Sequence, residues 1–586
     1  MSASALVLVA TRSVRTSDMR ARFQAARNTS LAAQQEPMRF LNHWLHMNEV
    51  SELRSERYMW LWLRGGVFVL LAALYFVRLG SGSLWDNSEP TYGEIVKEMF
   101  RTGDWITMHF NFAPWYIHPP LWFWIAGGAV KAFGLNELSL RLPSAIFGLL
   151  GAGATYLAAR RLYGEIAGLI AALALGTSLE YIVLCRLAIL DTTLVFFMTV
   201  TFFWGYFALR DGDRRAFWIA VVAAALGTLT KGPVALVLPL LSLLVYLWWA
   251  KAWQQVQRLP WAIGFLAYVL IAGSWFAAET GLHGQIFIID YFGASTFGRY
   301  LQPFENQPGP VYYYIPLLAV GFFPYVAFLP KAIKEAVLRR SNDDIFLLAS
   351  AIVPLVFFSA AQTKLPNYIV VIFPMLAVLV GGLVCEAIAA NQLKPLRGAL
   401  FMLPVSLVLL TIGVVLYLNI QVSQDLSALT PALALLGWIV VPTAALTLVA
   451  TLVTKRVWLA PLGFAAMMVG LIGALVIAIL PGVEAQKPMK AMAAHIQSLV
   501  RPGDKIGIAS VRGGFSLLFY TDNHGITFFG KVTGALSPWS FFGQKARVFA
   551  PITAAEYYSM QLMRVKSVYV WLRTPSMWLA SNRPPP

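Results

Sequence analysis

Long apolar runs are the feature that most constrains the fold of this chain. Fourteen such runs lie at about 59–79, 119–135, 142–159, 164–183, 191–209, 216–230, 232–250, 261–278, 311–329, 344–361, 366–388, 398–420, 431–453 and 457–481. A helix of roughly 20 apolar residues is long enough to cross the hydrocarbon core of a membrane. Only 12% of the residues are charged, whereas about a quarter are charged in a typical soluble domain. The sequence therefore predicts an all-α polytopic membrane protein.

The basic residues test which of these runs cross the membrane. If all fourteen cross and the N-terminus is cytoplasmic, the basic clusters at 160–161, 210–215 and 331–340 fall outside, against the positive-inside rule. Run 119–135 is short and contains Lys131, so we place it in the membrane interface. About thirteen transmembrane helices then remain, with a cytoplasmic N-terminus and an external C-terminus. This arrangement explains the net charge of +17 without a nucleic-acid partner.

The same reading divides the chain into three parts. Residues 1–58 are expected to be a cytoplasmic tail, or to follow from a start codon placed too far upstream. Residues 59–481 form the transmembrane domain, whose larger external loops are 80–141 and 279–310. Residues 482–586 are expected to form a small external α/β domain, because short strand-like runs alternate with a helical run and turns. The predicted helix is 487–500, and the predicted strands are 505–510, 516–521, 526–530 and 567–572.

The first external loop holds the densest group of carboxylates, in LWDNSEPTYGEIVKEMFRTGDW at 84–105. Pro90 and the acidic residues before it predict the start of a helix. An apolar stripe at helical spacing would let this helix lie on the bilayer surface; it consists of Tyr92, Ile95, Val96, Met99 and Phe100. Composition alone leaves two interpretations open. The acids either cap an interfacial helix in water, or Asp86 and Glu89 face a membrane cavity as a base or as metal ligands.

Several short motifs follow one another in order along the chain. They are SEPTYGEIVKEM, TGDW at 102–105, HPPL at 118–121, RLPS at 141–144, the loop before Asp191, KGP at 231–233, FGRYL at 297–301 and TKLPNY at 363–368. With this series the chain resembles the C-type (GT-C) glycosyltransferases that use polyprenyl-phosphate sugars. That family includes the protein O-mannosyltransferases and the bacterial lipid A aminoarabinose transferase. The resemblance covers roughly residues 60–480.

This resemblance implies a fold and an activity. The fold would be the GT-C fold, with interfacial helices in the first external loop. The activity would be transfer of a sugar from a polyprenyl-phosphate donor to a lipid A-like glycolipid, a glycan or a protein at the external face of a bacterial inner membrane. Such a transfer inverts the anomeric carbon and is assisted by a carboxylate. The donor sugar, pentose or hexose, stays open.

The resemblance also implies the site residues. Glu89 is the first choice for the general base, Asp86 is the second, and Asp191 is expected to hold donor or acceptor in the catalytic pocket. A carboxylate at the end of an apolar span is costly, which also marks Asp191 as functional. The expected substrate-binding residues are Tyr92, Tyr116, His118, Lys231, Arg299, Lys364 and Tyr368. Taken alone, each of the cations is as easily explained as a side chain that reaches the lipid headgroups.

Four positions depart from the family pattern. Ser88 stands where the family has aspartate, and His118 where it has lysine. Ile117 and Ala294 occupy positions that are acidic or histidine in some relatives. No cofactor is certain, and a divalent metal stays open. His118 would replace lysine as a donor to phosphate when it is protonated or in the right tautomer.

Two other functions stay open. A transporter or lipid flippase would also suit many spans and a basic cavity, although the charged residues gather at the external ends of spans rather than at mid-bilayer. A non-catalytic family member would suit the departures at Ser88 and His118. The presence of Glu89, Asp191, Arg299 and Tyr368 argues against that second alternative.

Overall fold

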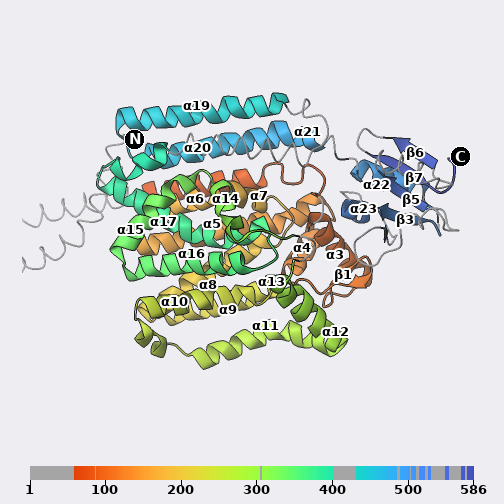
Figure 1. Ribbon diagram of the computed structural model, residues 1–586, viewed down its shortest axis with the longest axis horizontal. Helices are drawn as coiled ribbons and strands as arrows, with labels where there is room; N and C mark the ends of the chain where they lie inside the picture. The colour runs from red at the N-terminus through yellow and green to blue at the C-terminus, as the bar shows by residue number, and fades with distance from the viewer. Residues whose placement is uncertain are drawn as a thin grey trace, which may run out of the picture.

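The computed structural model shows a stack of long helices with a small sheet at one end (Figure 1). The structure describes residues 58–85, 88–303, 307–401, 430–484, 487, 489–501, 503–509, 514–521, 526–529, 548–552, 569–573 and 577–585. Nearly all of the predicted tail 1–58, most of the predicted span 398–420, and Asp86 therefore lie outside the described residues.

The described part of the chain contains seven helices that are long and apolar enough to cross a membrane. They are Tyr58–Phe76, α5 (Glu137–Tyr163), α8 (Asp191–Asp211), α11 (Trp261–His283), α16 (Asn342–Ala360), η5 with α17 (Pro366–Ile372 and Phe373–Ala389), and α20 with the start of η8 (Leu459–Ala474 and Leu475–Ile479). The number rises to nine if each of two bent helix pairs is one span. The first pair is α6 (Glu165–Gly176) with α7 (Leu179–Cys185), and the second joins η3 (Val311–Tyr313) and α14 (Tyr314–Gly321) to η4 (Tyr325–Phe328) and α15 (Leu329–Arg339). The chain is an integral membrane protein.

The count of thirteen spans stays a prediction. Two of the predicted spans form helices that are not among these seven. Helix α9 (Arg214–Lys231) carries cations at both ends, and α10 (Val234–Trp249) has only 16 residues. A third, α19 (Thr430–Thr454), is described only in part. Short segments complete the bundle: η1 (Trp253–Arg258), α12 (Gln285–Ile288), the π-helix η2 (Ile289–Gly298), α13 (Arg299–Leu301), η6 (Lys394–Leu396) and α21 (Leu480–Glu484).

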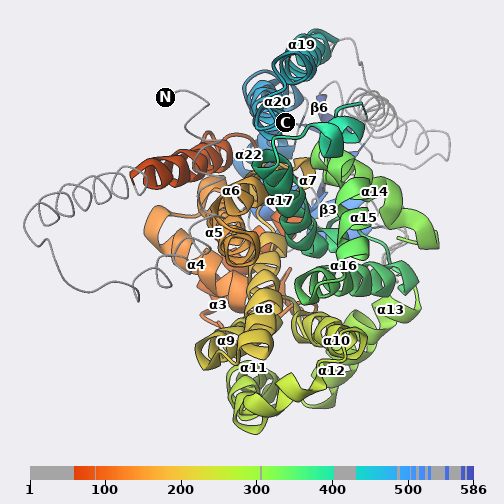
Figure 2. The ribbon, with the colours of Figure 1, turned by 90° about the vertical axis from the view of Figure 1, so that its left-hand side faces the viewer.

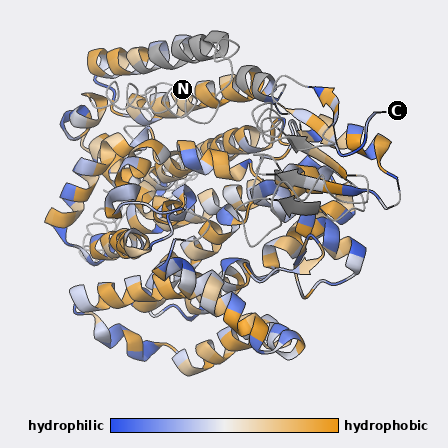
Figure 3. Ribbon diagram, turned by 45° about the vertical axis from the view of Figure 1, so that its right-hand side comes forward, coloured by the Kyte–Doolittle hydropathy of each residue, from blue (hydrophilic) through white to orange (hydrophobic). Residues whose placement is uncertain are grey.

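Viewed along the helices (Figure 2), α5 and α8 lie near the centre, α19 and α20 at one edge, and α11 and α12 at the opposite edge. Aromatic side chains fill part of the core, where the rings of Tyr206 and Phe346 stack with centroids 4.0 Å apart. Hydrophobic residues dominate the long helices, and hydrophilic residues gather towards their ends and in the C-terminal part (Figure 3). This distribution is the one expected when helices cross an apolar layer.

Two glycines of α5 let α7 approach it closely. A Cβ atom at Gly148 would lie 2.2 Å from the sulfur of Cys185, and one at Gly151 would lie 2.3 Å from the hydroxyl oxygen of Tyr181. Only a residue without a side chain fits at such distances. This packing fixes the end of α7, and therefore the turn that leads into α8.

The predicted first external loop, residues 80–141, contains α3 (Ser88–Thr102), a hairpin of β1 (His109–Phe110) and β2 (Ala113–Pro114), and α4 (Leu121–Phe133). The expectation that the apolar stripe of α3 lies on the bilayer is wrong for most of the stripe. Ile95, Val96 and Met99 are buried in a cluster with Trp122 and Phe123 of α4, because the aromatic face of α4 covers them. With 13 residues, α4 is too short to cross the hydrocarbon core.

A five-stranded sheet forms near the C-terminus, in the order β4-β3-β5-β7-β6. Its strands are β3 (Lys505–Ala509), β4 (Ile526–Phe529), β5 (Val548–Ile552), β6 (Tyr569–Arg573) and β7 (Trp578–Ser581), and helix α22 (Met489–Leu499) precedes them. β3 pairs in parallel with β4 and β5, whereas β7 is antiparallel to β5 and β6. Figure 1 shows this sheet at the end of the bundle that also carries α3 and α4.

The prediction of a strand at 516–521 is wrong, since this segment forms helix α23 (Gly514–Tyr520). Its adjacent residues Leu517 and Leu518 are both buried, which suits a helix held between two surfaces. The ammonium of Lys97 in α3 donates hydrogen bonds to the carbonyl oxygens of Leu518, Phe519 and Thr521. A cation from a distant helix thus caps the carbonyl end of α23, and the sequence of the segment itself carries no sign of this contact.

Candidate active site

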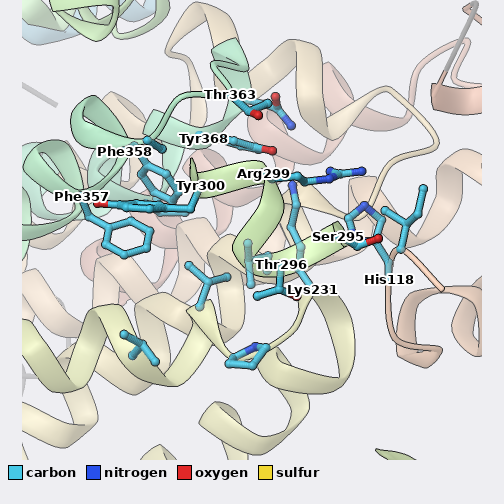
Figure 4. Close-up of a pocket in the computed structure, with 18 of the residues that line it drawn as sticks. His118, Lys231, Ser295, Thr296, Arg299, Tyr300, Phe357, Phe358, Thr363 and Tyr368 are labelled. Atoms are coloured by element: carbon cyan, nitrogen blue, oxygen red, sulfur yellow. The ribbon is translucent and has the colours of Figure 1, made fainter. Parts of the chain in front are cut away.

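A cavity of about 520 Å³ lies at the end of the bundle nearest to α3 and α4. Loop residues and the ends of α8, α9, α10, η2, α16 and η5 line it. Its polar wall includes His118, Asp191, Lys231, Arg299, Asn367 and Tyr368, and its apolar wall includes Val195, Val234, Val237, Phe292, Phe297 and Phe357. Figure 4 shows Lys231, Arg299, His118 and Tyr368 converging on one side, with Phe357, Phe358 and Tyr300 on the other. The cavity is therefore amphipathic.

Asp191 is the first residue of α8 and is 5% exposed. Its Oδ1 atom accepts hydrogen bonds from the Lys231 ammonium at 2.6 Å and from the side-chain amide of Asn367 at 2.8 Å. The positive end of the helix dipole also favours a carboxylate at this position. These contacts hold the carboxylate on the cavity wall. Sequence reasoning found Asp191 but missed Asn367, although Asn367 belongs to the TKLPNY motif.

Lys231 ends α9, and its ammonium lies 5.2 Å from the ring centroid of Tyr368. Gly232 follows with φ of 94°, a left-handed conformation that ends a helix readily only with glycine. A Cβ atom there would also lie 2.5 Å from the Tyr291 hydroxyl oxygen. The chain therefore turns sharply at Gly232 and leaves the ammonium at the cavity.

His118 lies between β2 and α4, where it is 7% exposed and lines the cavity. Its ring packs edge-on against Tyr92 and Trp115, with centroids 6.0 and 5.6 Å away. Burial lowers the pKa of His118 well below its usual range, and the positive charges of Lys231 and Arg299 lower it further. The imidazole is therefore neutral when the cavity holds no anion.

Glu89, the first choice for the general base, lies outside the cavity, so its role as the base stays a prediction. Glu89 is 1% exposed and does not line the cavity. Both carboxylate oxygens bind the Arg141 guanidinium at 2.9 Å, and they also accept from the backbone N–H groups of Trp85 and Ala188 at 2.6 and 2.5 Å. A carboxylate with all of these partners has no lone pair left for the proton of an acceptor. Asp86, the second choice, lies outside the described residues, so its role stays a prediction.

Three expected substrate-binding residues also lie away from the cavity wall. Lys364 donates to the carbonyl oxygens of Phe358, Ser359 and Ala361, so that it caps the C-terminal end of α16 instead of meeting a ligand. The remaining two are aromatic supports: Tyr116 packs against His283 and Phe287, and Tyr92 packs behind His118 against Trp115, Trp122 and Phe123. The cavity thus brings together Asp191, His118, Lys231, Arg299 and Tyr368 of the predicted set.

Metal ligation stays open. Among the described residues, no group of three or more His, Cys, Asp or Glu side chains is placed to hold a metal ion. Asp86, one of the two carboxylates considered above as a metal ligand, is not among those residues.

Comparisons with known proteins relate the chain to one group. Residues 117–276 match the family described as dolichyl-phosphate-mannose-protein mannosyltransferase. The chain is 29% identical over 371 residues to an uncharacterised protein of Aquifex aeolicus, covering 63% of this chain and 72% of that protein. It is also 29% identical over 365 residues to the undecaprenyl phosphate-alpha-4-amino-4-deoxy-L-arabinose arabinosyl transferase of Pseudomonas aeruginosa. That second match covers 61% of this chain and 65% of the relative, slightly less than two thirds of its length.

The fold also matches a solved structure. The crystal structure of ArnT from Cupriavidus metallidurans bound to undecaprenyl phosphate superposes with a TM-score of 0.71. The match has 23% sequence identity and covers 88% of this chain and 97% of ArnT. The apo form of the same protein matches equally well, with a TM-score of 0.71 and 24% identity. The overall fold is thus shared over most of this chain.

Proposed function

We propose that this chain, which has the fold of the C-type glycosyltransferases and is related in sequence to the bacterial aminoarabinose transferases, is a membrane glycosyltransferase with a polyprenyl-phosphate-linked donor. One observation carries this proposal. The cavity combines an apolar wall, a cluster of cations and a single carboxylate among its described lining residues. These are the three chemical features that a lipid-linked phosphate sugar and an attacking hydroxyl group require.

The donor fits the cavity by charge and polarity. Lys231 and Arg299 would hold the phosphate, because charge-assisted hydrogen bonds to phosphate are strong. The apolar wall, with Val234, Val237 and Phe297, would bury the first isoprene units of the tail, since burial of apolar surface is favourable by about 25 cal/mol per Å². The sugar would then lie beside Asp191. Undecaprenyl phosphate, which the solved relative binds, is the carrier that we propose for this chain.

The reaction follows from this placement. An acceptor oxygen attacks the anomeric carbon from the face opposite the phosphate, and a new C–O bond forms as the bond to the phosphate oxygen breaks. The polyprenyl phosphate leaves with the electron pair, and Lys231 and Arg299 stabilise its negative charge. Asp191 takes the proton of the acceptor. Both of its hydrogen bonds fall on Oδ1, so Oδ2 is the oxygen that receives this proton.

The topology and the partners belong to the same proposal. The cavity, α3, α4 and the C-terminal sheet lie at one end of the bundle. We assign this end to the external face of a bacterial inner membrane, with thirteen spans, a cytoplasmic N-terminus and an α/β domain at 482–586. The acceptor is a lipid A-like glycolipid, a glycan or a protein, and the sugar is a pentose or a hexose. The end of the bundle opposite the cavity carries basic residues, among them Lys331 and Arg339 of α15. Because cytoplasmic ends are enriched in lysine and arginine, this supports the orientation.

Neutralising Lys231 or Arg299 is expected to weaken the binding of undecaprenyl phosphate by about 10–100-fold, because each removes a charged hydrogen bond of about 1.5–3 kcal/mol. Binding of the labelled lipid to purified protein measures the effect in Lys231→Gln and Arg299→Gln. Lys490→Gln is the matched control, since Lys490 is exposed, pairs with Glu137 at the start of α5, and does not line the cavity. Equal affinity in all three variants would show that the donor lipid does not bind in this cavity.

Donor affinity is expected to rise as the pH falls, because of His118. The phosphodiester of the bound donor is negatively charged at every pH of the titration. It therefore raises the pKa of the adjacent imidazole above its depressed value in the empty cavity. Binding then takes up a proton between the two pKa values, and the gain in affinity is lost as the pH rises through the higher one. Titrating lipid binding against pH in wild type and in His118→Lys checks this. The two proteins should differ in slope; superimposable pH profiles would show that His118 does not meet the phosphate.

A further inference from the structure

We propose that Glu89 is a positioning residue for Asp191, acting through the backbone of the turn at 186–190. This inference rests on the proposed function, because it takes Asp191 as the base. The turn joins the end of α7, at Cys185, to the start of α8, at Asp191. A residue that fixes this turn therefore fixes the start of α8, and with it the position of the Asp191 carboxylate in the cavity.

Three side chains hold the turn, two of them from other parts of the chain. Glu89 of α3 accepts a hydrogen bond from the N–H group of Ala188, three residues before Asp191. Ser144 of α5 donates its hydroxyl to the carbonyl oxygen of Ile189 at 2.7 Å. From within the turn, the Arg186 guanidinium donates to the carbonyl oxygens at the end of the first helix; these belong to Leu74, Tyr75 and Val77, at 2.7, 3.0 and 2.9 Å. Ala188 and Ile189 are themselves buried.

Glu89 is in turn held rigidly by Arg141. The guanidinium binds both carboxylate oxygens, and it also donates to the carbonyl oxygens of the chain just before α3; these belong to Leu79, Ser81, Gly82 and Ser83. Both side chains are almost fully buried, at 1% and 4% exposure. The pair thus joins α3, α5 and residues 79–85 into one unit, and the Ala188 N–H group is fastened to that unit.

The opposite side of Asp191 is fixed by Lys231 and Asn367. Its carboxylate therefore stands between two anchors, one on the turn and one across the cavity. A base must lie within about 3 Å of the proton that it removes, and a displacement of about 1 Å can lower a rate 100-fold. Loss of the Glu89 contact is expected to disturb this geometry without touching the groups that hold the donor.

The experiment compares kcat, the KM for donor and the pH dependence of kcat in Glu89→Gln and Ser144→Ala. The glutamine is isosteric, but its NH₂ group would face the N–H donors that now surround Glu89. Both variants are expected to lower kcat by about 10–100-fold, as loss of an outer positioning contact does, with donor KM within about twofold of wild type. The dependence of kcat on pH should keep its shape, because neither substitution removes the proposed base.

Glu98→Gln is the matched control. Glu98 lies on the same helix, is buried and also accepts from a backbone N–H group, that of Phe112, but it faces the β1–β2 hairpin. Its kcat should stay near wild type. Amide hydrogen exchange of the peptide that covers 184–190 gives a readout that does not need activity: exchange should rise in Glu89→Gln and Ser144→Ala and stay unchanged in Glu98→Gln.

Two results would overturn the inference. Loss of the acidic limb of the pH profile in Glu89→Gln, with the limb kept in Ser144→Ala, would make Glu89 itself the base. Unchanged kcat and unchanged exchange in Glu89→Gln would show that the Glu89 contact neither fixes the turn nor positions Asp191. If wild type transfers no sugar at all, the proposed function fails, and the exchange measurement still decides whether Glu89 holds the turn.

Discussion

Asp191→Asn is expected to lower the rate of sugar transfer by about 10²–10⁴-fold, the range that a positioned general base contributes. Asn keeps the shape of the side chain and an oxygen that accepts from Lys231 and Asn367, so the cavity should stay assembled. Binding of undecaprenyl phosphate should change little. The measurement is the initial rate of label transfer from a polyprenyl-phosphate sugar, together with binding of the lipid to the same preparations.

Asp213→Asn is a suitable control for this substitution. Asp213 also stands at a helix start, where it accepts hydrogen bonds from the N–H groups of Arg215 and Ala216, but it lies at the other end of α9 from Lys231 and the cavity. Asparagine is an equally good cap at such a position, so this variant should keep its rate. Transfer by Asp191→Asn at the wild-type rate would contradict the assignment of Asp191 as the base.

Arg141→Met is expected to destabilise the protein more than any surface substitution. Removing the guanidinium leaves the Glu89 carboxylate buried beside four carbonyl oxygens that lose their donor. Breaking a buried ion pair in this way costs about 3–5 kcal/mol. The melting temperature in detergent, followed by tryptophan fluorescence, should fall clearly, and the protein should aggregate at a lower temperature.

A second pair of variants separates this effect from the loss of any one charge. Lys331→Met breaks an exposed pair with Glu335, which is worth about 0–1 kcal/mol, so the melting temperature should hardly move. Arg141→Met combined with Glu89→Leu removes both buried charges and should recover part of the loss. A melting temperature of Arg141→Met equal to that of Lys331→Met would show that the buried pair is not a structural clamp.

Hydropathy predicted the helical membrane character of the chain because an apolar solvent dictates the length and composition of each crossing helix. The same reasoning marked Asp191, since a carboxylate at the end of an apolar helix is costly unless it has a use. Lys231 was expected from the resemblance alone. Asn367 escaped notice because a neutral amide carries no such penalty. Only the folded structure brings it to Asp191, 176 residues earlier in the chain.

Glu89 and Lys364 show why charge alone does not identify a residue that lines the cavity. Both are charged residues in motifs near the ends of helices, as Asp191 and Lys231 are. The Glu89 carboxylate accepts hydrogen bonds from Arg141, 52 residues later, and from the N–H group of Ala188, 99 residues later. Lys364 caps the helix that precedes it. Whether a charge faces a cavity or a buried partner depends on such long-range contacts, which residue spacing does not encode.

Local sequence also misassigned α23. The segment SLLFYT has the aromatic and apolar composition of a strand, but α22, the sheet and Lys97 of α3 surround it, and in that setting it forms a helix. The strands predicted at 505–510, 526–530 and 567–572 are found as β3, β4 and β6. Strands β5 and β7 were not predicted, since they pair with β3 and with each other only in the assembled sheet.

The most direct test of the central claim is release of polyprenyl phosphate from a synthetic undecaprenyl-phosphate sugar by the purified full-length chain, with a membrane extract as the source of acceptor. Wild type should release the phosphate lipid and form a labelled product with inverted anomeric configuration, and Asp191→Asn should do neither while still binding the lipid. If wild type binds the donor and moves it across the bilayer of reconstituted vesicles but transfers no sugar, the protein is a transporter. That result would contradict the glycosyltransferase account.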